Sequence, residues 1–168
     1  MTSNLEYKAV IDTYLKQLSE LCGKIVTSKD LSNIQEVNDL RIKSMRIKGL
    51  TPKKQFEISL NDLKKQRFKA YIDNLIKEKN NPVTIWLDST KTCGVLRIKS
   101  LDVFNFSFDP SIISGGVIVL LSEDCEEKFL LDFDLNSVEI DVSGNKWTKV
   151  EYYGALKESG ALKESGAL

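Results

Sequence analysis

The residues that could do chemistry in this chain are carboxylates, three cysteines and a basic stretch, because the sequence contains no histidine. Without histidine, the Ser–His and Cys–His nucleophile pairs, imidazole metal ligation and imidazole proton transfer are all excluded. Cys22, Cys93 and Cys125 are widely spaced with no C-x-x-C, which fits neither a disulfide framework nor a zinc site. No glycine-rich nucleotide loop occurs either. These patterns predict a protein that is not an enzyme and that holds no metal and no cofactor.

The densest group of carboxylates is the stretch Ser-Glu-Asp-Cys-Glu-Glu at residues 122–127. Clustered carboxylates suit Ca²⁺ or Mg²⁺, although this stretch lacks the EF-hand spacing. A second interpretation is a negative projection that binds a basic protein. A third is a solvated hairpin loop whose charges discourage edge-to-edge aggregation. The sequence leaves all three open.

Further carboxylates follow this stretch and alternate with apolar residues. Asp132 flanks Leu131 and Phe133, and the two acids of Glu139-Ile140-Asp141 flank an isoleucine. Alternation of this kind places several acids on the solvent face of one sheet, which is a landing surface for a cationic protein. The residues assigned to the candidate protein-binding surface are Glu123, Asp124, Glu126, Glu127, Asp132 and Asp134.

The two halves of the chain carry opposite charge, which the net charge of zero hides. Residues 1–80 hold 16 Lys and Arg against 10 Asp and Glu, whereas residues 81–168 hold 8 against 14. From residue 100 to residue 141 there is one base, Lys128, against 10 acids. Such asymmetry bears on partners and association rates. It also makes head-to-tail self-association possible.

The basic half offers an alternative function, in which residues 41–79 contact nucleic-acid phosphate. Such binding would be strongly salt-dependent. Phe68 and Tyr71 lie among the basic residues of this stretch and could stack on nucleobases, although aromatic residues at helical spacing more often belong to the core. The candidate nucleic-acid contacts are Lys64, Lys65, Arg67 and Lys69.

Apolar periodicity predicts helices in the first half of the chain. Residues 4–22 carry a stripe at spacings of three and four, with a capping-box pattern at Ser3-x-x-Glu6 and Gly23 at the C-terminal cap. Residues 33–47 favour a helix, although the part from residue 40 onward alternates like a strand. Thr51-Pro52 is a helix-start signal and predicts a helix over 52–79.

After Pro82 the pattern changes to short β-strands with turn residues between them. The expected strands are 83–87, 94–99, 103–108, 116–121, 128–133, 139–142 and 147–152. Short connections predict antiparallel pairing, including a hairpin across the acidic stretch.

The chain is therefore expected to belong to the α+β class, with N-terminal helices packed on a C-terminal antiparallel sheet or a small barrel. The strand layout from Val83-Thr84-Ile85-Trp86-Leu87 to Val138-Glu139-Ile140 is similar to an SH3-like or Sm-like barrel, a fold shared by RNA binders and protein binders. The expected organisation is a helical region at 1–81 and an antiparallel β region at 82–153. Residues 154–168 repeat Gly-Ala-Leu-Lys-Glu-Ser, which indicates a tag or a duplication.

These features favour a non-enzymatic protein-binding module of the inhibitor or immunity-protein type, with an acidic β-domain face that binds a basic protein such as a toxin or nuclease. No apolar run reaches the length of a membrane helix, and the N-terminus lacks the features of a secretory signal. A cytoplasmic location with no membrane partner is therefore expected.

Overall fold

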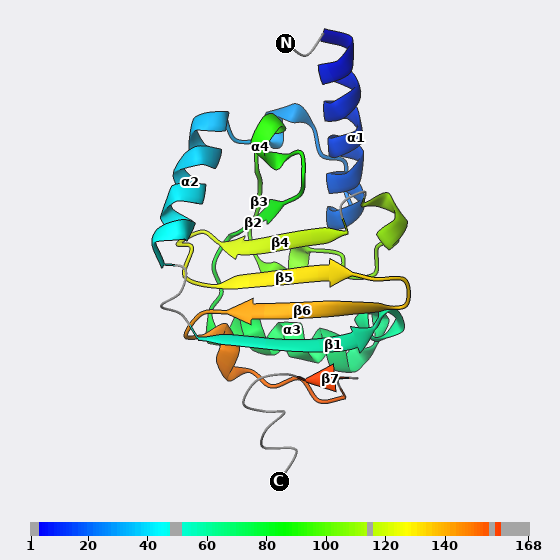
Figure 1. Cartoon of the computed structure of the whole chain (residues 1–168), viewed down its shortest axis with the longest axis vertical. Coiled ribbons are helices and arrows are strands. Elements are labelled where there is room, and N and C mark those ends of the chain that lie inside the picture. The colour runs from blue at the N-terminus through cyan, green and yellow to red at the C-terminus, as the bar shows by residue number, and fades with distance from the viewer. Residues whose placement is uncertain (1–3, 48–51, 114–115, 155–156, 159–168) are drawn as a thin grey trace.

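A computed structural model of the protein describes residues 4–47, 52–113, 116–154 and 157–158 (Figure 1). The described residues form a seven-stranded sheet in the order β3-β2-β4-β5-β6-β1-β7, in which neighbouring strands run antiparallel. The strands are β1 Lys53–Ser59, β2 Val83–Trp86, β3 Leu96–Ile98, β4 Val117–Ser122, β5 Lys128–Phe133, β6 Ser137–Ser143 and β7 Lys157–Glu158.

The helices precede or connect these strands, so the chain belongs to the α+β class as expected. Within the described residues β3 and β7 lie at opposite ends of the strand order and do not pair, so the sheet is open and not a closed barrel. The α-helices are α1 Asn4–Cys22, α2 Ile34–Ile47, α3 Gln66–Glu78 and α4 Thr90–Cys93. The short 3₁₀ helices are η1 Ser28–Asp30, η2 Leu60–Lys64, η3 Leu101–Val103, η4 Pro110–Ile112 and η5 Trp147–Lys149.

Helix α3 connects β1 to β2 and lies across the back of the sheet in Figure 1. Its apolar stripe of Phe68, Tyr71, Ile72 and Leu75 is buried. Alternate residues of the central strands belong to the same apolar cluster. They are Phe56 and Ile58 of β1, Val138, Ile140 and Val142 of β6, Phe129 and Leu131 of β5, and Ile118 and Leu120 of β4. Because strand side chains alternate between faces, this cluster defines one covered face of the sheet and leaves the other face to the intervening residues.

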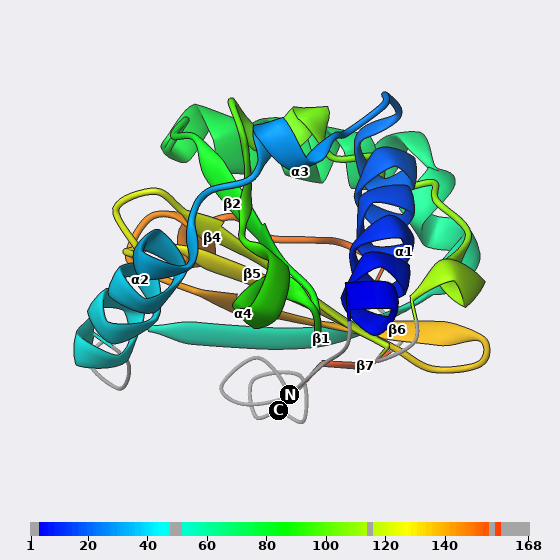
Figure 2. The ribbon, with the colours of Figure 1, turned by 90° about the horizontal axis from the view of Figure 1, so that it is seen from above.

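The N-terminal helix confirms the prediction for 4–22, and Gly23 has the left-handed conformation (φ +63°) expected of a C-terminal cap. The predicted cap at Ser3 lies outside the described residues. Tyr14, Leu18 and Leu21 are buried in the core, whereas Leu5 is 81% exposed. The first half of the helix extends beyond the body of the protein in Figure 1, and Figure 2 shows α1 on the same side of the sheet as α3. Helix α2 likewise matches the helix predicted over 33–47.

The helix predicted over 52–79 is wrong in its first half. Residues 53–59 form β1, residues 60–64 form η2, and only Gln66–Glu78 is α-helical. The predicted cap residue Thr51 lies outside the described residues. Strand β1 pairs with β6 along its whole length, from Lys53 opposite Ser143 to Ser59 opposite Ser137. The sheet therefore takes strands from both the 1–81 and the 82–153 ranges.

Two of the predicted strands are also wrong. Residues 101–108 contain η3 followed by turns, and Phe104 and Phe108 are buried with Phe106 packed against them. The Phe104 ring packs edge to face against both the Phe106 and the Phe108 ring, so this segment contributes to the hydrophobic core and is not a strand. At 147–152, the buried Trp147 opens η5 and the chain then continues without regular structure to residue 152.

The remaining predicted strands are confirmed with small shifts of their ends. The β4–β5 hairpin across the acidic stretch is present, with Val117 opposite Asp132 and Leu121 opposite Lys128. Between β2 and β3 the chain forms the single turn of α4. Among the described helices, none has both the length and the apolar character needed to cross a membrane.

Candidate protein-binding face

The acidic stretch 122–127 forms the β4–β5 turn, and two cations of the chain pair with three of its four carboxylates. Lys79 pairs with Asp124 and, at 2.8 Å, with Glu126. Burial by itself would raise the pKa of Asp124, but hydrogen bonds from Lys79 and Ser122 outweigh it and hold this pKa below its usual value. At the outer side of the turn Glu123 pairs with Arg97 at 3.2 Å. These pairs offset part of the negative charge of the turn, whereas the Glu126 side chain stays exposed.

Glu127 faces into the protein and not into solvent. Its exposed fraction is 1%, and its carboxylate accepts hydrogen bonds from the backbone N–H groups of Lys146 at 2.8 Å and Trp147 at 3.1 Å. Burial raises the pKa of this carboxyl above its usual range. Gly144 lies so close that an added Cβ would overlap the Glu127 carboxylate. Glu127 therefore holds the turn after β6 and is not accessible to a partner.

A different group of carboxylates lies on the open face of the sheet, opposite the face covered by α3. Strand register places Glu57 of β1 directly opposite Glu139 of β6, and Glu139 directly opposite Asp132 of β5. Each of these acids lies between two strand residues whose side chains belong to the buried cluster or pack against it. These three acids form one cross-strand row, which we call the carboxylate row.

The neighbouring row on the same face is largely apolar. Trp86 of β2, Val119 of β4 and Leu130 of β5 are successive cross-strand partners, and Leu130 is followed by Asp141 of β6 and Gln55 of β1. The first four of these five side chains are half-buried and Gln55 is exposed. Figure 1 shows no helix in front of the centres of β4, β5 and β6. The open face therefore combines a half-exposed apolar strip with adjacent carboxylates.

The carboxylate row has polar neighbours on the same face of the sheet, with Gln55 and Asp141 in the adjacent cross-strand row and Lys128 beyond them on β5. Gln55 donates a hydrogen bond from its amide to Glu139. One carboxylate oxygen of Asp141 is buried without a hydrogen-bond partner among the described residues. Like charges that lie directly opposite each other across a sheet are destabilising. The two like-charge pairs in this row therefore lower the stability of the free protein.

The six predicted binding residues do not form one surface in the structure. Asp132 lies on the open face, and Asp134 is exposed in the β5–β6 turn, where it accepts a hydrogen bond from the Leu135 backbone. The three turn acids Glu123, Asp124 and Glu126 are paired, and Glu127 is buried. Sequence reasoning missed Glu57 because it was assigned to a helix. The alternation Gln55-Phe56-Glu57-Ile58 was the available signal for a strand.

The predicted nucleic-acid contacts are brought together only in part. Lys64, Lys65 and Lys69 line a hollow of about 380 Å³ between α3 and residues 102–107, and its wall includes the half-buried Phe106. Arg67 is not part of this hollow, because its guanidinium pairs with Asp62 at 2.9 Å. Lys65 also pairs with this carboxylate, at 2.9 Å.

No group of three or more Cys, Asp or Glu residues in the described part of the chain is arranged to hold a metal ion. All three cysteines are free and buried, and burial raises the pKa of each thiol above its usual value. A thiol with a raised pKa is a poor nucleophile at neutral pH.

Comparison of the chain with protein-family models, with curated proteins and with solved structures finds no match.

Proposed function

We propose that this protein is a non-enzymatic binding module of the inhibitor or immunity-protein type, and that the open face of its sheet binds a basic protein. The observation that carries the proposal is the carboxylate row of Glu57, Glu139 and Asp132. These acids repel one another in the free protein, and a cationic partner would relieve that repulsion on binding.

The apolar strip beside the row supports the same proposal. Protein interfaces combine a desolvated apolar centre with a polar rim, and tryptophan is among the residues enriched at binding hot spots. On this face Trp86, Val119 and Leu130 provide the apolar centre, and the carboxylate row provides charge on one side of it. The lack of histidine in the sequence supports a role in binding rather than catalysis. A cytoplasmic location remains part of the proposal.

The proposal is tested by reversing charge on the open face and comparing it with the same reversal elsewhere. In the double variant Asp132→Lys/Glu139→Lys, two members of the row become cationic. The matched control reverses Glu20 and Glu78, two exposed acids near the C-terminal ends of α1 and α3 that line neither surface. Immobilised wild-type and variant proteins are used to capture partners from the native host, and association rates with the captured partner are then measured at low and moderate salt.

We expect a basic protein that is captured by the wild type and by the control but not by the open-face variant. The association rate of the open-face variant should fall by at least about tenfold at low salt, because electrostatic steering changes rates by about 10- to 10³-fold. Equal capture by both variants would show that the open face is not the binding surface. A captured partner with an acidic face would show that the partner class is wrong.

A second candidate function is phosphate binding by the basic half of the chain. The specific observation in its favour is that Lys64, Lys65 and Lys69 line one hollow together with Phe106, which combines cations with an aromatic ring. Asp73 and Asp102 line the same hollow and oppose an anionic ligand. RNA and DNA binding, measured by fluorescence anisotropy at about 50 and about 200 mM salt, separates the two candidates. A salt-sensitive signal that is lost in Lys64→Ala/Lys65→Ala/Lys69→Ala would favour this second function.

A further inference from the structure

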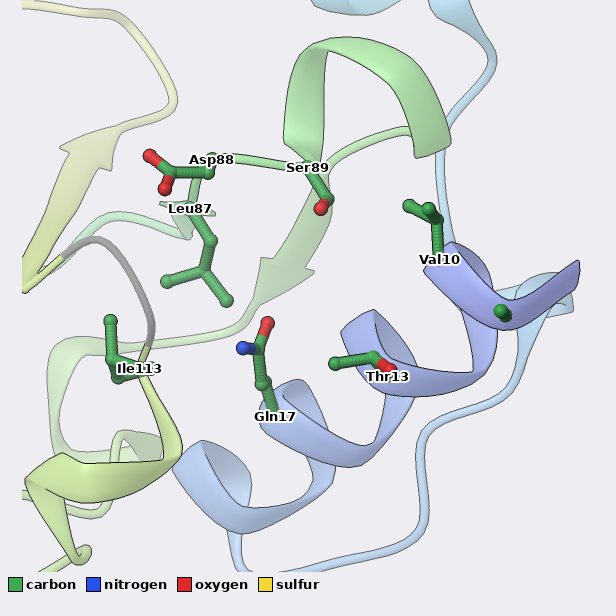
Figure 3. Close-up of a pocket in the computed structure, with 8 residues that line it drawn as sticks. Val10, Thr13, Gln17, Leu87, Asp88, Ser89 and Ile113 are labelled. Carbon is green, nitrogen blue, oxygen red and sulfur yellow. The ribbon is translucent and has the colours of Figure 1, made fainter. Parts of the chain in front are cut away.

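A pocket outside both surfaces lies where α1 passes the end of β2, and Figure 3 shows its lining. Its volume is about 290 Å³. Ligand sites for drug-sized molecules start at roughly 300 Å³, so this pocket suits a small group or one side chain of a partner. Four of its lining residues come from α1, three follow β2 directly, and Ile113 precedes β4.

The polar side chains of the pocket are one carboxylate, one amide and two hydroxyls, and the hydroxyls can both donate and accept hydrogen bonds. The Gln17 amide nitrogen donates to the backbone oxygen of Ile112 at 2.9 Å, which fixes the side chain and leaves its oxygen to face the pocket (Figure 3). The Ser89 hydroxyl points into the same space and does not cap α4. Asp88 lies at the rim, and its carboxylate has no ion-pair partner among the described residues. Among the described residues, no lysine or arginine lines the pocket.

The rest of the lining is apolar. Val10, Leu87 and Ile113 form walls around the acceptors, and Thr13 turns its methyl group toward Gln17 in Figure 3. A ligand that fits must therefore carry hydrogen-bond donors at one end and an apolar stem behind them. An anion is excluded, because it would face the Asp88 carboxylate and the Gln17 oxygen without any cation to pair with.

We propose that this pocket binds a protonated alkylamine or a guanidinium group on a short aliphatic stem. An alkylammonium has three donors and no acceptor, which suits the Gln17 oxygen and the Ser89 hydroxyl that face the pocket, and the Asp88 carboxylate at the rim adds negative charge nearby. The apolar walls cover the methylene groups of the stem, as they do for buried parts of lysine and arginine side chains. The same chemistry is supplied by a lysine or arginine of a partner protein and by a free amine. The inference does not depend on the proposed function of the open face.

The test is a titration of the isotope-labelled full chain, followed by amide chemical shifts at pH 7. The probes are n-butylammonium chloride and 1-butanol, which has a similar stem but no charge. We expect saturable shifts at residues 9–17 and 87–89 with butylammonium, and at least tenfold weaker binding of 1-butanol. The double variant Asp88→Asn/Ser89→Ala should weaken butylammonium binding at least tenfold. The control Asp102→Asn should leave binding unchanged, and thermal unfolding of each variant verifies that it is folded.

Equal affinity for the alcohol and the ammonium ion, unchanged affinity in the double variant, or shifts spread over exposed acids throughout the chain would each overturn the proposal. A second comparison of probes shows whether the bound cationic group belongs to a partner protein or to a free amine. Tighter binding of Nα-acetyl-lysine or Nα-acetyl-arginine methylamide than of putrescine identifies a partner's side chain as the ligand. The reverse order identifies a free amine. Both readings can be obtained even if no protein binds the open face.

Discussion

Asp132 and Glu139 lie directly opposite each other in the pairing of β5 with β6, and both side chains face away from α3. Asp132 is exposed and has no ion-pair partner among the described residues. Two acids in direct cross-strand contact weaken the sheet in the free protein. This relationship gives the first testable consequence of the fold.

Replacing Asp132 with Asn should stabilise the free protein by about 0.2 to 1 kcal/mol at low salt, because it removes a like-charge cross-strand pair. The gain should shrink as salt screens the repulsion. Urea unfolding at two salt concentrations measures it. Asp134→Asn is the matched control, since Asp134 lies in the turn and an Asn oxygen can still accept the Leu135 hydrogen bond. A loss of stability in Asp132→Asn would mean that the acid has a favourable partner.

Replacing Glu127 should destabilise the protein strongly, in contrast to the small gain in stability expected for Asp132→Asn. Glu127→Ala leaves the N–H groups of Lys146 and Trp147 without their acceptor and should destabilise the protein by about 2 to 4 kcal/mol. Glu126→Ala removes one exposed ion pair in the same turn and should cost less than about 1 kcal/mol. Chemical denaturation of the two variants makes the comparison. Similar losses would show that Glu127 does not hold η5.

Asp62 should govern stability in acid. Burial by itself raises the pKa of Asp62, but hydrogen bonds from Lys65, Arg67, Ser59 and Tyr152 outweigh it and lower this pKa from 3.8 to about 2. Because the folded pKa is lower than the unfolded pKa, the stabilisation is present above pH 4 and is lost as pH falls toward 2. The loss should be about 2 kcal/mol.

Unfolding free energies measured between pH 5 and pH 2 for the wild type and Asp62→Asn check this contribution. The variant should be less stable at pH 5 and should lack that part of the acid dependence. Asp102→Asn, a change at an exposed acid on the same side of the protein, should retain the wild-type slope. If the Asp62→Asn variant kept the full loss of stability in acid, that loss would have to come from other carboxyl groups.

Two buried tyrosines should respond differently to loss of the hydroxyl group. Tyr14 donates to the Gly94 carbonyl at 2.6 Å and contacts the Thr90 hydroxyl at 2.9 Å, whereas the Tyr71 hydroxyl is buried with no hydrogen-bond partner among the described residues. Tyr14→Phe should therefore destabilise the protein by about 1 to 2 kcal/mol. Tyr71→Phe should be neutral or stabilising, because it removes an unsatisfied polar group. Thermal and urea unfolding of the pair provide the measurement, and equal losses would contradict it.

Much of the local structure follows from the sequence. The stripe through Tyr14, Leu18 and Leu21 correctly predicts α1, and the apolar runs around Ile118 and Phe129 correctly predict the β4–β5 hairpin. Local signals also misled, because Pro52 is a genuine helix-start residue and yet residues 53–59 form a strand. Seven register pairs with β6 outweigh that local preference, since strand formation depends on cross-strand packing more than on propensity.

The alternation of acids with apolar residues determined that Asp132, Glu139 and Asp141 lie on the solvent side of a sheet. Only the tertiary structure decided that Glu57 joins Asp132 and Glu139 in one row, and that the acids of the turn are paired with Lys79 and Arg97 or buried. The physical reason is the distance along the chain over which each feature is determined. A side chain's face is set by its immediate neighbours, whereas its cross-strand partner and its ion pair come from residues far away in the chain, and strand register places them.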